Sequence, residues 1–244
     1  MQKRNLTPLA ALALIASLGL AGCAAPAEPT AEPTTPKQTS QAPEPAPSET
    51  ETESPEPSAA AANGPAPEWF TGATDVGELI GETQTDSWDV RVYQVGTGTA
   101  DTDSREVDPD TKESLLPAGT EVVFLNFVYT NRSDNTLNLN TIPDPALRLP
   151  DWKFLGGQPG VVNPELYRAQ GIEKGGYDVN KVAKHASGTL IYAVAPGESI
   201  AEATSIAYEP GTEPTAKLTF SAKDDADQLI DAELQEATVT VRIK

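Results

Sequence analysis

The segment from Glu121 to Thr130, EVVFLNFVYT, is apolar on both faces when it is read as an extended chain. Side chains alternate between the two faces of a strand, so a half-buried strand has one polar face, and this segment has none. The pattern therefore predicts a central strand. The polar run that follows, NRSDN, contains Asn and Asp, which tolerate left-handed backbone and predict a turn into a hairpin.

Shorter stretches of the same period-two pattern recur on both sides of this segment. From Trp88 onward apolar residues alternate with polar ones, and Leu137 and Leu139 suit the hairpin partner. We expect further strands at residues 146–149, 189–195, 199–208, 217–222 and 238–244, and helical turns only at 163–168 and 224–234. Short strands separated by turns about every 8–12 residues favour an all-β fold, an antiparallel sandwich or barrel.

Residues 24–66 have a different composition and cannot join that fold. They are rich in Ala, Pro, Glu, Thr and Ser, and they contain no aromatic or β-branched aliphatic residue. Nothing in the stretch offsets the entropy lost when a backbone is ordered. We therefore predict a disordered Pro/Glu/Thr-rich tether over residues 23–66, followed by one globular domain over residues 67–244.

The first 22 residues have the layout of a secretory signal peptide. A short basic stretch precedes an apolar run over residues 6–20, which is shorter than the ~20 apolar residues of a spanning helix. The run leads into Leu20, Ala21, Gly22 and Cys23, which resemble the lipobox of bacterial lipoproteins. In that family the Cys thiol is alkylated by a diacylglyceryl group and becomes the first residue of the mature chain. The resemblance implies that Cys23 is a lipid attachment site.

Lipidation of Cys23 would account for the only cysteine of the chain. Two acyl chains are enough for stable membrane anchoring, whereas one is marginal. We therefore expect a lipid anchor in the membrane and a place on the extracytoplasmic face of the cell membrane. The formal charge of −19 excludes nucleic acid as a partner, because phosphate contacts need clustered Lys and Arg.

Three stretches of the globular part resemble a known family. They are TEVVFLNFVYTNRSDNTLNLN, ALRLPDWKFLGG, and SGTLIYAVAPGESIAEATSIAYEP with the later AKLTF. Together they look like the immunoglobulin-like domain of many Gram-positive lipoproteins of unknown function. The resemblance covers about residues 88–222 and implies an immunoglobulin-like antiparallel β-sandwich outside the cytoplasm, but no active-site residue. The long segment 156–187 departs from this layout.

The residue types offer little for catalysis or metal binding. His185 is the only histidine and no Gly-x-Ser-x-Gly motif occurs, so we expect no catalytic residue and interpret His185 as solvated. One His and one Cys are too few for zinc or copper. The acidic stretch 101–110 offers oxygen ligands for calcium, but Arg105 and Glu106 do not fit an EF-hand loop, so a solvated loop is favoured. We expect no metal and no cofactor.

Aromatic residues are the remaining candidates for binding. Trp88 lies in phase with a strand and is expected in the core, and Trp69 is expected to cover a core edge, although it or Trp152 could stack on sugar or peptide. Loops held by a rigid scaffold commonly carry function, so segment 156–187 is the first choice for a partner surface, with a structureless insertion as the alternative. The candidates for partner contact are Trp152, Tyr167 and Tyr177.

Two hypotheses for function follow from these observations. In the first, the chain is a lipid-anchored surface protein whose domain is a non-catalytic binding or spacer module, with an envelope protein or polysaccharide as its partner. In the second, it is an envelope enzyme or a solute-binding receptor that uses an acidic cleft. A pocket with perturbed carboxylates would favour the second hypothesis, and a convex sandwich with an exposed aromatic loop would favour the first.

Overall fold

The computed structural model describes residues 63–244, and nearly all of its regular structure is β-strand. The predicted signal peptide, the lipobox of Leu20, Ala21, Gly22 and Cys23, and most of the predicted linker lie outside the described residues. The strands form antiparallel sheets that pack together, which confirms the predicted all-β sandwich.

The first sheet contains the central strand that the sequence predicts. Its order is β1-β2-β3-β8, and all its pairs are antiparallel. Residues 122–129 of β3 are buried, as expected for a strand that is covered on both faces. The strands are β1 (Glu78–Gln84), β2 (Trp88–Thr99), β3 (Glu121–Asn131) and β8 (Ser199–Ala207).

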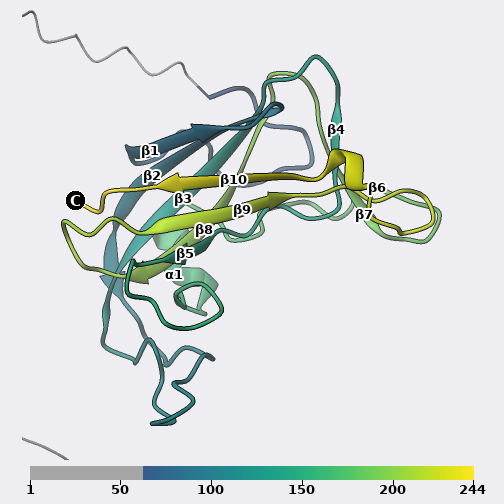
Figure 1. Ribbon diagram of the computed structural model, residues 1–244. Helices are drawn as coiled ribbons and strands as arrows, with labels where there is room; N and C mark the ends of the chain where they lie inside the picture. The colour runs from purple at the N-terminus through teal and green to yellow at the C-terminus, as the bar shows by residue number, and fades with distance from the viewer. Residues whose placement is uncertain (1–62) are drawn as a thin grey trace, which may run out of the picture. The chain divides into compact units, whose positions relative to one another are not determined.

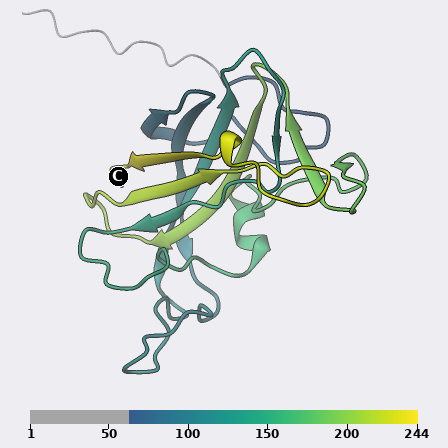
Figure 2. The ribbon, with the colours of Figure 1, turned by 45° about the vertical axis from the view of Figure 1, so that its right-hand side comes forward.

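A second sheet covers one face of the first. Figures 1 and 2 show its strands β9 and β10 lying across the strands of the first sheet. Phe220 of β9 stacks on Trp88, with ring centroids 4.9 Å apart, and meets Tyr129 edge-on at 5.4 Å. The order is β10-β9-β5, with β5 (Ala146–Arg148), β9 (Thr215–Phe220) and β10 (Gln235–Thr240).

A third, smaller sheet lies at one end of the sandwich. Its order is β4-β7-β6, with β4 (Leu137–Leu139), β6 (Ala183–Lys184) and β7 (Leu190–Val194). The sequence Pro-Gly-Glu forms the turn after β7, and the Gly197 N–H donates a 2.8 Å hydrogen bond to the Asn131 carbonyl. This turn positions β8 beside β3.

Residues 161–172 of the long segment 156–187 pack against the opposite face of the first sheet, whereas Val182 joins the main core. It contains the helix α1 (Pro164–Ala169), which begins where the sequence predicts and is capped by Asn163, whose Oδ1 accepts from the Glu165 N–H at 3.0 Å. Val161 and Ile172 on either side of the helix join a second core cluster with Phe124. The segment is therefore part of the packed fold, and the alternative of a structureless insertion is wrong.

Several details differ from the sequence-based expectations, and one of them is the last strand, β10, which spans Gln235–Thr240 instead of 238–244. Strand β1 was not predicted, because Gly81 interrupts its alternating pattern. A Cβ atom at Gly81 would lie 2.8 Å from Val241 Cγ1, where the edges of the first and second sheets meet. Residues 224–234 contain only the 3-10 helix η1 (Asp231–Glu233). Residues 63–66 already bond to the sandwich, since the Ser199 N–H donates to the Pro65 carbonyl at 2.9 Å. The packed part thus begins before the predicted boundary at residue 67.

Candidate functional site

A pocket of about 250 Å³ opens beside β8, and we call it the Glu202 pocket. It lies where β8, β7, the loop before β5 and the segment after α1 meet. Its lining combines carboxylates, an ammonium group and tyrosine rings. The lining residues are Thr141, Ile142, Asp144, Lys174, Gly175, Tyr177, Tyr192 and Glu202.

Glu202 occupies an inward-facing position on β8, where a β-sandwich ordinarily has an apolar side chain. In the register with β3, Glu202 lies opposite Phe127, and Ile200 lies opposite Tyr129. Directly opposed residues of an antiparallel pair share one face, so Glu202 belongs to the inner face of the sheet with these core residues. Ile200 is fully buried, and Glu202 is only 5% exposed. A carboxylate is therefore held at the margin of the core.

One carboxylate oxygen of Glu202 is used to hold the segment after α1. The Gly175 N–H donates to Glu202 Oε2 at 3.0 Å. Gly175 has a φ of +63°, in the left-handed region that glycine adopts without strain. At the rim, Lys174 Nζ lies 3.8 Å from Asp144 Oδ1, and both side chains are substantially exposed. The ammonium group of Lys174 thus pairs with Asp144 and does not form an ion pair with Glu202.

The environment of Glu202 favours its neutral form. Burial raises the pKa of the Glu202 carboxyl to about 7 from its ordinary 4.5. The hydrogen bond from Gly175 lowers this pKa, the charge of Asp144 raises it, and the charge of Lys174 lowers it by less. Glu202 therefore changes its charge near neutral pH, and a positive group placed beside it would favour the ionised form.

Aromatic rings form the other wall of the pocket. Tyr177 and Tyr192 meet edge-on, with ring centroids 5.2 Å apart, and the centroids of Trp69 and Tyr192 lie 5.3 Å apart. The Trp69 Nε1–H donates to the Ala193 carbonyl at 2.7 Å, which fixes the cluster to β7. Burial and the adjacent Tyr177 hydroxyl raise the pKa of Tyr192. Tyr177 remains 38% exposed, so its ring is accessible to a ligand.

The three predicted partner-contact residues lie in three different environments. Tyr177 lines the Glu202 pocket. Tyr167 is 1% exposed, and its hydroxyl lies 3.0 Å from Ser205 Oγ, so it is a core residue and its proposed place on a partner surface is corrected. Trp152 is half-buried, and its Nε1–H donates to the Gly156 carbonyl at 2.8 Å. It forms a separate loop cluster with Phe154, beside the exposed Leu155.

The other tryptophans lie where the sequence predicts. Trp88 is 2% exposed in the core, and Trp69 is 6% exposed at its edge.

Sequence reasoning missed most of the Glu202 pocket. One local signal was available, because Glu202 is the only charged residue within the otherwise apolar or small-residue run SIAEATSIA of β8. Asp144, Lys174 and Tyr192 carry no comparable signal, since they come from separate connections and from an ordinary strand. Only the folded chain brings them together.

His185 is less exposed than the sequence suggests. Its side chain is 10% exposed, and its Nδ1 lies 2.9 Å from Asp225 Oδ1, so the interpretation of a solvated histidine is corrected. The backbone of His185 bonds to Thr189, whose hydroxyl donates to Asp227 at 3.0 Å. These contacts join the β6–β7 hairpin to the loop at 223–229, and Figure 1 shows the two side by side. This cluster is structural.

Three carboxylates of the acidic stretch 101–110 accept hydrogen bonds from the protein itself. Asp103 Oδ1 accepts from the Ala118 N–H and Asp108 Oδ1 accepts from the Asp110 N–H, each at 2.8 Å. The two backbone N–H bonds to Asp108 lower the pKa of that carboxyl. Asp101 Oδ2 accepts from Asn163 Nδ2 at 2.6 Å. Within residues 63–244, no group of three or more His, Cys, Asp and Glu side chains is placed to hold a metal ion.

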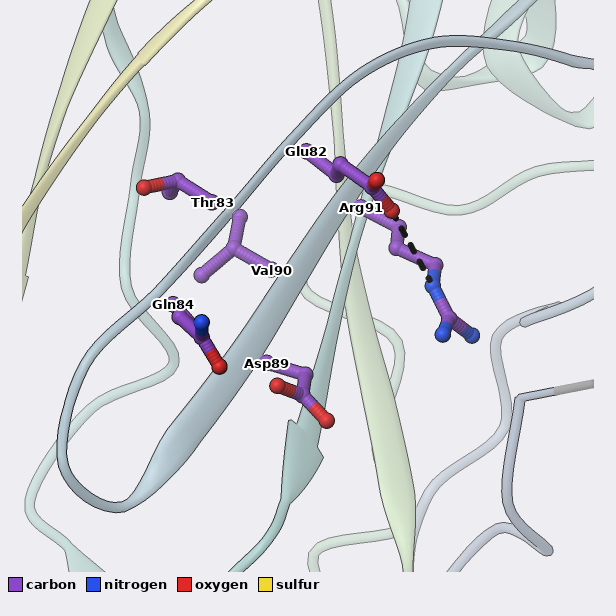
Figure 3. A pocket seen from close by; sticks show the side chains of 6 residues that line it. All are labelled: Glu82, Thr83, Gln84, Asp89, Val90 and Arg91. Carbon is purple, nitrogen blue, oxygen red and sulfur yellow. Dashed lines mark ion pairs between the residues drawn. The ribbon is translucent and has the colours of Figure 1, made fainter. Parts of the chain in front are cut away.

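A larger hollow, of about 410 Å³, lies on the β1–β2 hairpin. Figure 3 shows Glu82 and Arg91 side by side across the two strands, and the Arg91 Nε–Glu82 Oε2 distance is 3.9 Å. The two residues are directly opposed in the register, so this ion pair is an ordinary cross-strand contact. Arg91 Nη1 also donates to Asn63 Oδ1 at 3.1 Å. The charged Arg91 and Glu82 side chains of this hollow are therefore paired with each other, whereas Glu202 has no ion-pair partner among the described residues.

Comparisons with known proteins add no relative: no protein family model, no curated protein and no solved structure matches this chain. The resemblance to Gram-positive lipoproteins stays a prediction. Among residues 63–244, none of the helices has both the length and the apolar character that a membrane span requires.

Proposed function

We propose that this chain is a lipid-anchored protein of the extracytoplasmic face of the bacterial membrane, whose β-sandwich is a non-catalytic binding module. The observation that carries the proposal is the Glu202 pocket, where a carboxylate, two tyrosine rings and a rim ion pair converge. Binding sites characteristically combine an apolar or aromatic lining with a few convergent polar groups and a perturbed pKa. We also propose that the module is immunoglobulin-like.

The order of segments supports the proposed place in the cell. A signal peptide layout leads into Cys23, and a stretch without core-forming residues separates Cys23 from the sandwich. Such a stretch gives the module reach, because Pro-rich, negatively charged chains are extended. The module would then meet its partner in the envelope while it stays attached to the membrane.

The anchor is tested with a Cys23→Ala variant of the full chain in a Gram-positive host. We expect the variant to appear in the medium or to retain its signal peptide, whereas the native chain stays with the membrane and carries a diacylglyceryl mass on Cys23. An Ala24→Ser variant is the matched control, because it changes the next residue and leaves the thiol. Membrane retention of a cleaved Cys23→Ala chain at the native level would contradict lipidation.

The binding role is tested by cross-linking on intact cells. Removal of residues 156–187 would disrupt the second core cluster, so point variants are the better choice. Glu202→Gln keeps an oxygen that accepts from Gly175 and removes only the charge. Glu209→Gln is the control, because Glu209 is exposed on the chain just after β8. We expect Glu202→Gln to lose partners that the native chain and the control both capture, and equal recovery by all three would contradict the proposal.

A second candidate function is general acid–base catalysis at the same pocket. It is favoured by one observation, the pKa of about 7 at Glu202, which suits proton transfer near neutral pH. The assay is turnover of chromogenic glycosides and esters by the native chain and by Glu202→Gln. Turnover that Glu202→Gln abolishes and Glu209→Gln retains would replace the binding module with an enzyme.

A further inference from the structure

We propose that the Glu202 pocket binds the ammonium group of a small organic cation, with the Glu202 carboxylate facing the charge and the rings of Tyr177 and Tyr192 against its methyl or methylene groups. This inference rests on the proposed binding function and adds the chemical class of the ligand.

Within residues 63–244, Glu202 has one hydrogen-bond donor and no ion-pair partner. Gly175 N–H reaches Oε2, and the pocket cation Lys174 pairs with Asp144 instead. Buried carboxylates are ordinarily paired with a cation or satisfied by several donors. In its ionised form Glu202 thus lacks a paired cation, which a cationic ligand would supply.

The tyrosine rings that line the pocket also favour an ammonium ligand. An ammonium group is attracted to the face of a tyrosine ring, and aromatic cages with an acidic residue are a recurring way to bind methylated ammonium groups. Tyr177 and Tyr192 stand nearly perpendicular to each other, at 82°, and both line the pocket; Tyr177 is 38% exposed, and Tyr192 is 7% exposed. Trp69 also packs against Tyr192, with ring centroids 5.3 Å apart.

The volume of the pocket and the charges around it limit which ligands can bind. A volume of about 250 Å³ lies just below the usual range of small-molecule pockets, roughly 300–1,000 Å³, which favours a compact head group. Lys174 at the rim and Asp144 beside it leave Glu202 as the carboxylate inside the pocket. An anionic ligand would face Glu202 and Asp144 in a chain of charge −19, which disfavours binding.

The test uses choline and its uncharged isostere 3,3-dimethyl-1-butanol as probes, with the full chain purified in detergent. The two probes have nearly the same shape, so a difference in affinity measures the charge. At pH 8 we expect choline to bind at least about tenfold more tightly than the isostere, and the Gly175 amide resonance to shift during the titration. Equal affinity of the two probes would overturn the inference.

Variants identify the residues responsible. Glu202→Gln should lower choline affinity by about tenfold or more, Tyr177→Leu by severalfold, and Glu209→Gln by less than about twofold. Choline keeps its charge at all pH values, so its binding to the native chain should weaken between pH 8 and pH 5 as Glu202 becomes protonated. The charges of Asp144 and Lys174 also act on the pKa of Glu202. Besides burial, the charge of Glu202 in turn raises the pKa values of Tyr129 and Tyr167.

Glu202→Gln should abolish this pH dependence while the domain stays folded, as judged by its amide spectrum. An unchanged pH dependence in Glu202→Gln would overturn the assignment of the charge to Glu202.

A neutral sugar provides the outcome that separates this inference from the proposed function. N-acetylglucosamine that shifts the Gly175 resonance in the native chain, while choline does not, would refute the ammonium ligand and leave the binding module in place. Failure of both probes, together with unchanged cross-linking in Glu202→Gln, would refute the binding role of the pocket itself.

Discussion

Ile200 and Glu202 lie two residues apart on the same face of β8, yet they belong to two different regions of the molecule. Ile200 joins the sandwich core that Trp88, Tyr129 and Phe220 fill with ring contacts. Glu202 lines a pocket that opens to solvent between the loop before β5 and the segment after α1. The two positions belong to one strand and pair with the same neighbouring strand, and their surroundings differ.

This difference shows that β8 departs at Glu202 from the apolar pattern of inward-facing residues. The core side of the strand is explained by burial of apolar surface, which stabilises the fold and needs no ligand. A carboxylate at the neighbouring inner position costs stability, because its charged form is removed from water. Departures of this kind are expected at functional sites. The predictions below test the contrast between the two regions.

The largest effect is expected in the core. Phe220→Ala should lower the free energy of unfolding by about 3–5 kcal/mol, because it removes a buried ring and leaves a cavity beside Trp88 and Tyr129. Urea unfolding followed by tryptophan fluorescence measures the change. Phe154→Ala is the control, since Phe154 is half-buried in a loop and should cost much less. Equal losses in the two variants would contradict the assignment of the core.

The pocket should contribute a pH dependence to stability. The pKa of Glu202 is raised to about 7 in the folded chain, so the folded state holds this proton more tightly than the unfolded state, whose pKa is about 4.5. Stability should therefore fall as pH rises from about 4.5 to 7, by about 2–3 kcal/mol from this group. Unfolding free energies measured between pH 4 and pH 8 give the slope.

Glu202→Gln separates this contribution from those of other carboxylates. The variant should be less dependent on pH over the same range and more stable than the native chain at pH 8, because the amide carries no charge. Glu209→Gln should keep the native slope. A native slope in Glu202→Gln would place the titrating group elsewhere.

A smaller effect is expected on the opposite face of the first sheet. Tyr167→Phe should lower stability by about 1 kcal/mol, because the Tyr167 hydroxyl bonds to Ser205 Oγ at 3.0 Å and to the Val161 carbonyl at 3.2 Å. Tyr208→Phe removes a hydroxyl that bonds to the exposed carbonyl of Lys244 and serves as the comparison. Thermal unfolding of both variants gives the values, and a larger loss in Tyr208→Phe would contradict the buried role of Tyr167.

The smallest effect is expected for an exposed charge pair between β2 and the turn after β3. Arg132 Nε lies 3.4 Å from Asp89 Oδ1, and both side chains are about 40% exposed. Asp89→Asn should change stability by no more than about 0.5 kcal/mol, and added salt should remove the difference. A change as large as that of Glu202→Gln would mean that exposed and buried carboxylates do not differ in this protein.

The sequence was a good guide wherever period-two patterning was strong. The doubly apolar segment at 121–130 is the central strand β3, and the capped turn at Asn163 begins the helix α1. Strand β1 was missed because Gly81 is needed for close contact between sheet edges, which local patterning does not encode. Tyr167 was misplaced because a tyrosine in a connecting segment gives no sign that the segment folds back onto a sheet.

The candidate site could be predicted only in part. Tyr177 was chosen because long connections on a rigid scaffold tend to carry function, and it does line the Glu202 pocket. Glu202 itself was hidden because the chain is rich in carboxylates, and only the register with β3 shows that this one faces the core. The partners Asp144 and Lys174 meet through tertiary structure alone.

The most direct test of the account is the pKa of Glu202 in the ligand-free chain. The ¹³Cδ resonance of Glu202, assigned by comparison with Glu202→Gln, reports this pKa as pH is varied. We predict a value near 7, and a decrease when choline is present at saturating concentration. A pKa near the ordinary 4.5 would show that Glu202 is fully solvated or already paired with a cation, and would contradict the account.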